Sequence, residues 1–221
     1  MRITVGKIQL NYEKQGAGAP LILLHGNGEN HHIFDKLSMR LKEDYTVYAI
    51  DSRNHGESTQ TDDYSYATMA RDIEGFIRNL ELEDVSILGF SDGAIIALTL
   101  AILNPELFNK MVLLGVNLQP SDFNDEYRLE LLDEYEKTGD PLLKLMLEQP
   151  DIKLNQLRNV TTPTLVVAAE NDLFKPELFQ SIVTTMPKAE LLIMPEHNHD
   201  SYVIGQDILY PHLKSFFNEM P

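Results

Sequence analysis

The sequence of 221 residues contains no cysteine and has few positive charges. Without cysteine no disulfide can form, and the absence fits a reducing compartment, so we expect a cytoplasmic protein. Only 18 Lys and Arg residues stand against 34 Asp and Glu residues, which gives a formal net charge of −16. Because so negative a field repels nucleic acid and anionic membrane surfaces, we expect neither as a partner.

Long hydrophobic runs are also lacking. The longest, Ala94 to Leu103, is about half of what a bilayer requires, so it predicts a buried helix and no membrane insertion. No basic segment with a following apolar core stands near the N-terminus, and no secretory signal is expected. The length suits one sizeable core, and a content of 43% hydrophobic and 24% charged residues is typical of a globular protein.

The most informative stretch is the segment from Gly89 to Ala94, with the sequence GFSDGA. It follows an apolar strand pattern at Val85–Leu88 and precedes the helix pattern of Ala94–Leu103. Strand, sharp turn with a serine, and helix together make a nucleophile elbow, in which glycines allow the two backbones to approach closely. Ser91 is therefore the predicted nucleophile, and the alternative is an ordinary helix N-cap.

Apolar runs typical of strands alternate with helical periodicity along most of the chain. The runs lie at Leu21–Leu24, Thr46–Ile50, Val85–Leu88, Met111–Val116, Thr164–Ala168 and Leu191–Met194, and Lys7–Glu13 alternates like an antiparallel strand. Helical spacing covers residues 67–80 and 178–186, and a last helix is expected to begin near Pro211. This order predicts an α/β fold: an open, mostly parallel sheet with helices on both faces, whose chemistry lies at the carboxyl ends of the strands.

One interval, residues 118–160, breaks the alternation because it contains no strand pattern. Two helices fit there, Asn124–Lys137 and Leu142–Leu147. We expect this insertion to form a helical lid over the strand ends, and the alternative is an ordinary pair of connecting helices. The remaining residues, 1–117 and 161–221, are predicted to form a single core domain. The densest acidic stretch, Asp122–Glu136, predicts a solvated face within the insertion.

A serine becomes a useful nucleophile when a base takes its proton and a carboxylate orients that base. In a fold of this type the partners follow in the order Ser, Asp or Glu, His, at strand ends. Asp172 and His199 fit that order behind Ser91, and Glu170 is the alternative acid. His197 is the alternative base. A metal site around these histidines is not expected, because adjacent loop positions rarely supply a closed site.

The chain resembles the α/β-hydrolases of the compact bacterial serine-hydrolase type over nearly its whole length. The motifs that carry the resemblance are Leu23–Gly28, Asp51–Ser58, Gly89–Ala94, Asn104–Glu106, Asn171–Asp172 and Pro195–His199. In that family the base lies four residues after the proline that ends the last strand, which selects His199 over His197. The resemblance implies a serine esterase that needs no cofactor.

Acyl transfer also needs donors for the oxyanion. The backbone amide of Asp92, directly after the nucleophile, is one, and the family pattern places the second at Asn27. His25 and His55 are expected to pack turns rather than to react. Side chains that could line a pocket, with core packing as the alternative, are His32, Phe34, Val116, Phe123, Tyr127 and Phe174.

The predicted function is hydrolysis of a small carboxylic ester or thioester through an acyl-enzyme, without cofactor or metal. One alternative is that the triad of Ser91, Asp172 and His199 acts on a lactone, an amide or a carbon–carbon bond, or transfers the acyl group to an acceptor other than water. The other is a protein that binds or senses a small molecule on a hydrolase fold. The short lid argues against large enclosed substrates, including those of carbon–carbon bond hydrolases. The acyl group, the leaving group and the oligomeric state are left open.

Overall fold

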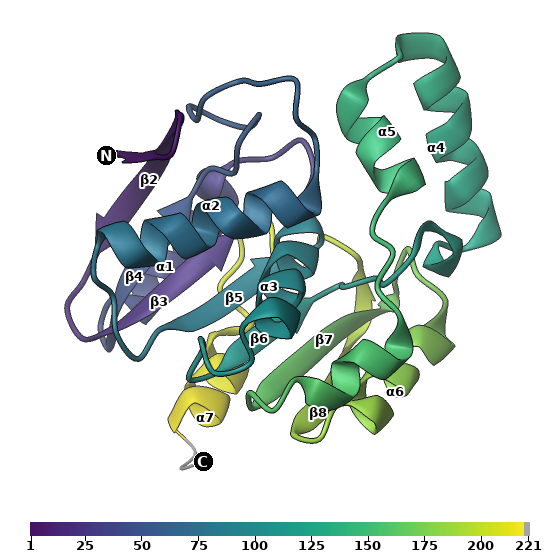
Figure 1. The fold of residues 1–221 in the computed structure, drawn as a ribbon. Coiled ribbons are helices and arrows are strands. Elements are labelled where there is room, and N and C mark those ends of the chain that lie inside the picture. The colour runs from purple at the N-terminus through teal and green to yellow at the C-terminus, as the bar shows by residue number, and fades with distance from the viewer. Residues whose placement is uncertain (219–221) are drawn as a thin grey trace.

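The computed structural model describes residues 1–218, which form a sheet covered by helices on both faces (Figure 1). Within these residues the sheet has eight strands in the order β1-β2-β4-β3-β5-β6-β7-β8. Strand β1 is antiparallel to β2 and β2 is antiparallel to β4, whereas all other neighbours are parallel. The strands are β1 Arg2–Val5, β2 Ile8–Gln15, β3 Ala19–Leu24, β4 Tyr45–Ile50, β5 Ser86–Phe90, β6 Met111–Leu114, β7 Thr164–Asn171 and β8 Ala189–Asn198. The predicted fold class is confirmed.

Helices fill most of the connections between the strands. The α-helices are α1 Asp35–Leu41, α2 Tyr66–Asn79, α3 Asp92–Leu103, α4 Asp125–Thr138, α5 Pro141–Glu148, α6 Pro176–Thr185 and α7 Tyr210–Asn218. Short 3₁₀ turns lie at His31–Phe34, Pro120–Asp122 and Leu154–Asn159. In the part of the chain that the structure describes, none of the helices has the length and apolar character needed to cross a bilayer.

Strand β3 shows why the sheet needs helices on both faces. Its residues from Leu21 to Leu24 are all fully buried, but alternate side chains enter different hydrophobic clusters. Ile22 and Leu24 pack with residues of α2 and α3, whereas Leu21 and Leu23 pack with residues of α1 and α7. A continuous apolar strand is therefore stable only in the middle of a three-layered structure.

Two short elements, β1 and α1, were not predicted from the sequence, and strands β7 and β8 extend beyond their predicted ends. Strand β1 has one buried side chain, that of Val5, and α1 spans only seven residues, so neither gives a clear hydrophobic period. Strands β7 and β8 continue past their apolar parts, and the pairing of Asn171 with Asn198 follows an irregularity in the ladder. Backbone pairing extends these strands where the side chains are already exposed.

Both helices predicted in the insertion are present, as α4 and α5. Figure 1 shows the two helices packed side by side and projecting beyond the rest of the fold. Helix α4 buries only Leu131, which agrees with the solvated face expected from its acidic sequence. Gly139 ends α4 in the left-handed conformation, and the side chain of Asp140 caps α5 by accepting from the Leu142 N–H at 2.8 Å.

The junction of β5 and α3 is the tightest point of the fold. A Cβ atom at Gly89 would overlap the backbone of Gly93 and Ala94, and a Cβ at Gly93 would overlap the Leu24 carbonyl group. These contacts involve rigid backbone, so no side-chain adjustment can relieve them. Gly89 and Gly93 are therefore required for strand and helix to meet at Ser91.

Replacing Gly89 by alanine should destabilise the protein more than the same change at Gly139. Gly139 has a φ of 65° but open space around its Cα, so Gly139→Ala carries only the conformational cost of about 1–2 kcal/mol. Gly89→Ala forces backbone apart, and we expect a loss of about 3 kcal/mol or more. Urea unfolding followed by circular dichroism measures both losses, and equal losses would contradict the steric argument.

Candidate active site

Ser91 occupies the turn between β5 and α3 with φ 51° and ψ −115°. A positive φ is uncommon for a residue with a side chain and marks local strain held by the surroundings. Its N–H is fixed by the Leu114 carbonyl at 2.8 Å, whereas its hydroxyl makes no capping hydrogen bond to α3. The side chain is therefore free of the N-cap role that the sequence left open.

Asp172 and His199 lie directly after β7 and β8 and form a hydrogen bond with each other. Nδ1 of His199 lies 2.8 Å from Oδ1 of Asp172, and the two side chains are 9% and 2% exposed. Asp172 also accepts hydrogen bonds from the backbone N–H groups of Leu173 and Ala169, at 2.8 and 3.0 Å. Its carboxylate is thereby satisfied on both oxygens and fixes the imidazole on the Nδ1 side.

The opposite ring nitrogen of His199, Nε2, is buried and makes no hydrogen bond to any residue that the structure describes. The ring is held between Phe90 and Phe174, with centroid distances of 5.0 and 5.3 Å. The His199 ring also packs against Gly115. A side chain at this position would collide with the ring, since a Cβ there would lie 2.8 Å from Nδ1 of His199. The imidazole is thus tightly positioned with one unused nitrogen, which is an unusual state for a buried polar atom.

The alternative acid and base have other partners. The Glu170 carboxylate accepts from the Glu196 N–H at 2.7 Å, and His197 pairs through Nδ1 with the Ser201 hydroxyl at 2.9 Å. Neither is hydrogen-bonded to His199. Among residues 1–218 no three His, Cys, Asp or Glu side chains converge in a way that could hold a metal ion.

The backbone N–H groups of Asn27 and Asp92 donate to no other residue in the described part of the chain. Asp92 begins α3, so its N–H lies at the positive end of that helix. The Asn27 side chain ties three segments together, because its Nδ2 donates to Oδ2 of Asp92 at 2.9 Å and to the Leu142 carbonyl of α5 at 3.2 Å. Tyr66 donates to the other oxygen of Asp92 at 2.7 Å.

The Asp92 carboxyl is fully enclosed by these neighbours. Burial raises the pKa of Asp92, and the hydrogen bonds from Tyr66 and Asn27 counteract part of that effect. Its side chain is therefore engaged within the protein, and only its backbone N–H remains available.

His25 anchors the loop that carries Asn27. Its Nδ1–H donates to the Gly26 carbonyl at 2.7 Å, and its Nε2 accepts from the Ser52 N–H at 3.0 Å. Burial lowers the pKa of His25 to about 4, so the ring is neutral around pH 7. These bonds give His25 a structural position, as the sequence suggested.

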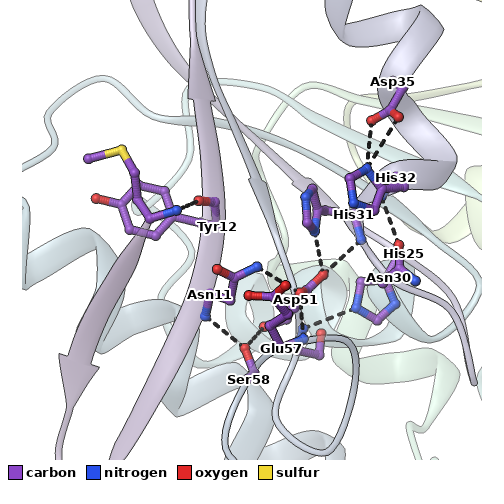
Figure 2. Close-up of polar contacts among 12 residues, drawn as sticks. Asn11, Tyr12, His25, Asn30, His31, His32, Asp35, Asp51, Glu57 and Ser58 are labelled. Atoms are coloured by element: carbon purple, nitrogen blue, oxygen red, sulfur yellow. Dashed lines mark hydrogen bonds and ion pairs between the residues drawn. The ribbon is translucent and has the colours of Figure 1, made fainter.

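Asp51 is the centre of a buried network next to this loop (Figure 2). One oxygen accepts from the N–H and from Nδ1 of His31, at 2.8 and 2.7 Å, and the other accepts from Asn11 and the Glu57 N–H, both at 2.9 Å. Burial opposes ionisation of Asp51, but these hydrogen bonds outweigh it and lower its pKa. The network joins the residue after β4 to β2, to the 3₁₀ turn at His31–Phe34 and to the segment around Glu57.

A cavity of about 470 Å³ opens beside Ser91 and His199. Besides these two, it is lined by Gly26, Asn27, Glu29, Phe90, Phe123, Tyr127, Leu143, Met146, Leu173, Asn198 and Asp200. The lining therefore combines the loop after β3, the elbow, both helices of the insertion and the loop after β8. A volume of this size suits a small molecule.

Of the six predicted pocket residues, Phe123 and Tyr127 line this cavity. The other four do not: His32 is exposed and pairs with Asp35, Phe34 and Val116 are buried in the core, and Phe174 packs behind the His199 ring. Helical or strand-end position alone does not tell core from pocket, because the difference depends on which elements pack alongside.

The lining residues that were not predicted from the sequence include Glu29, Leu143, Met146, Leu173 and Asp200. Glu29 and Asp200 had a signal, since each lies within two residues of a selected position after a strand. Leu143 and Met146 stand three apart on α5, the spacing of one helical face.

Comparison with known proteins places the chain in a family. The profile of the alpha/beta hydrolase fold matches residues 19–138, more than half of the chain. This protein belongs to the alpha/beta hydrolase family. The chain is 24% identical to a putative esterase/lipase of Haemophilus influenzae, over 97% of this chain and 90% of that protein.

One further relative and one solved structure are also similar to the chain. A 2-(acetamidomethylene)succinate hydrolase of Mesorhizobium japonicum is 32% identical over 61% of this chain, and the aligned part covers only 46% of that protein. The aligned part thus spans about half the length of that curated relative. Among solved structures, a variant of the meta-cleavage product hydrolase CumD superposes with a TM-score of 0.82 at 20% identity, covering 100% of this chain and 98% of the other.

The buried neutral His25 predicts a specific loss of stability in acid. Because its folded pKa is about 4 against an ordinary 6.5, the stability it contributes is complete above pH 6.5 and is lost as the pH falls towards 4. We expect wild type to lose about 3 kcal/mol more than His25→Gln between pH 7 and pH 4. Urea unfolding across this range measures how the free energy of unfolding of each protein depends on pH. Equal pH dependence in wild type and variant would contradict the prediction, because it would mean that the pKa of His25 is not lowered in the folded protein.

Proposed function

We propose that this hydrolase cleaves a small carboxylic ester or thioester through an acyl-enzyme formed on Ser91. The observation that carries the proposal is the unpaired Nε2 of His199, buried at the cavity that Ser91 also lines, while Asp172 holds the opposite nitrogen. A base with one fixed and one free nitrogen, at the same cavity as a strained serine, is an arrangement from which the serine can be activated.

In the proposed first half-reaction the Ser91 oxygen attacks the substrate carbonyl carbon while Nε2 of His199 takes the serine proton. The carbonyl π electrons move to oxygen and form a tetrahedral oxyanion. When the intermediate collapses, the bond to the alcohol or thiol breaks, and the leaving group takes the proton from Nε2. Asp172 keeps the imidazole in the correct tautomer and stabilises the imidazolium form.

Water completes the cycle by the same route. His199 removes a proton from water as its oxygen attacks the acyl-enzyme, and then returns the proton to Ser91 as the acid leaves. The N–H groups of Asn27 and Asp92 would stabilise the oxyanion in both halves, since neither donates to another residue among those that the structure describes. The α3 N-terminus adds a favourable dipole at the same place.

We assign residues 118–160 the role of a lid. Three described residues of α4 and α5 line the cavity, Tyr127, Leu143 and Met146, and so does Phe123, which lies just before the N-cap residue of α4. The hydrogen bond from the Asn27 side chain to the Leu142 carbonyl joins this insertion to the loop after β3, residues 25–30, which we call the proposed oxyanion loop. Cover of this kind would keep bulk water from the acyl-enzyme.

The relatives support ester hydrolysis in general terms. The Haemophilus influenzae relative, named a putative esterase/lipase, matches almost the full length of this chain. The same residues would serve a lactone, an amide or a carbon–carbon bond, so product identification on a substrate panel should accompany any activity test.

Labelling with a fluorophosphonate probe tests the proposed nucleophile and base. We expect a single adduct on wild type by intact mass, no adduct on Ser91→Ala, and labelling of His199→Ala slowed by roughly a hundredfold or more. Asp172→Asn should also label slowly, because the amide no longer selects the correct imidazole tautomer.

The chain supplies matched controls in the alternative acid and base. His197→Gln and Glu170→Gln alter groups that are bonded away from His199, so both variants should label at the wild-type rate. An unlabelled but well-folded wild type would favour a protein that binds or senses a small molecule. Slow labelling of His197→Gln with normal labelling of His199→Ala would exchange the two assignments.

A further inference from the structure

Glu29 places a carboxyl group in the candidate active-site cavity. It lies two residues after Asn27 in the loop that follows β3, and it is half-buried. Its Oε2 accepts from the Gly26 N–H at 2.9 Å. Its Oε1 makes no hydrogen bond to any residue that the structure describes. One oxygen is therefore anchored to the proposed oxyanion loop, and the other remains available to a bound molecule.

The charges around this cavity are of one sign. Asp200, which follows His199, also lines the cavity, and among its lining residues in the described chain none is Lys or Arg. His199 is the single lining side chain that can become positive, and its Nδ1 faces Asp172. The surrounding protein carries a formal charge of −16, so the local and the overall fields act in the same direction.

Ionisation of Glu29 is costly in this setting. Burial raises the pKa of Glu29 to about 7, although the Gly26 hydrogen bond and His199 favour the carboxylate, and Asp200 and Asp92 add to the rise. A second carboxylate brought in by a substrate would raise that cost further, because like charges at short range cannot both be ionised cheaply. A neutral or cationic group would bring no such cost.

We propose that Glu29 is a specificity-determining residue, which makes the hydrolase select esters with a neutral or cationic acyl group and reject those that carry a carboxylate. The inference rests on the proposed ester hydrolysis. It follows from a free carboxyl oxygen in the cavity, a second acidic side chain at the same cavity, and a lining without a permanent cation.

A purely structural role for Glu29 gives a different expectation. If it only holds the loop through Gly26, glutamine should replace it fully, because the amide oxygen accepts the same N–H. Glu29→Gln therefore keeps the anchor and removes the charge. Any change in charge selectivity in this variant reports on the carboxylate rather than on the loop.

The test compares three p-nitrophenyl esters that share a three-methylene spacer: valerate, hemiglutarate and 4-(trimethylammonio)butyrate. We would measure kcat/KM at pH 8, where Glu29 is mostly ionised, and subtract the background obtained with Ser91→Ala. Wild type should hydrolyse the anionic hemiglutarate roughly tenfold less efficiently than the neutral valerate, and the cationic ester at least as well as the valerate. Glu29→Gln should reduce the penalty on the hemiglutarate several-fold.

Glu83→Gln is the matched control. It removes the same charge from an exposed residue before β5, at the end of the strand opposite to Ser91, and should leave the ratio between the esters unchanged. If Glu29→Gln fails to fold, the pH dependence of wild type decides. The hemiglutarate-to-valerate ratio should rise as the pH falls below 7, because protonation of Glu29 removes the repulsion.

The ratio is the appropriate quantity because ionisation of the shared triad affects both esters and largely cancels. The other titratable groups that face Glu29 are His199, Asp200, Asp92 and Tyr127. A pH dependence of the ratio that persists in folded Glu29→Gln would belong to one of those groups and would overturn the inference.

The remaining outcomes separate this inference from the proposed function. Wild type that hydrolyses hemiglutarate as well as valerate, or a ratio unmoved by Glu29→Gln, would overturn the role of Glu29 and leave ester hydrolysis intact. Wild type that takes the fluorophosphonate but hydrolyses none of the three esters would overturn this inference alone. No adduct and no hydrolysis would remove both.

Discussion

The close contact between strand β5 and helix α3 is the constraint on which the site depends. Ser91 has a positive φ because Gly89 and Gly93 allow the two backbones to touch, and the Leu114 carbonyl holds its N–H. The strain of that turn is sustained by the buried sheet on one side and the buried helix on the other. In the same turn the Asp92 N–H, at the N-terminus of α3, donates to no residue within 1–218.

Parallel strand order then brings the remaining site residues to the same edge. Strands β5, β6, β7 and β8 are neighbours, so the residues that follow them converge although they are far apart in sequence. Ser91, Gly115, Asp172 and His199 each come directly after one of these strands. Gly115 has no functional group, yet its missing side chain provides the space that the His199 ring occupies.

Three buried or half-buried carboxyl groups near this edge of the sheet differ in how easily they ionise. Asp51 receives enough hydrogen bonds to stay ionised, whereas Asp92 and Glu29 are harder to ionise because burial exceeds what their partners return. The carboxylates of Asp51 and Asp92 accept hydrogen bonds from other residues of the protein, so they stabilise the fold. Glu29 alone of these three lines the cavity, which is why the proposed selectivity is assigned to it.

The sequence by itself determined the α/β layering, the elbow around Ser91 and the chain order of candidate acid and base, because these follow from local periodicity and short motifs. It did not determine β1 or α1, whose buried faces are too small to give a period. Only the tertiary structure decided which side chains meet the cavity: Glu29 and Asp200 do, whereas His32, Phe34, Val116 and Phe174 do not. The physical reason is that a cavity is formed by segments from distant parts of the chain, and no local pattern records which of their faces come together.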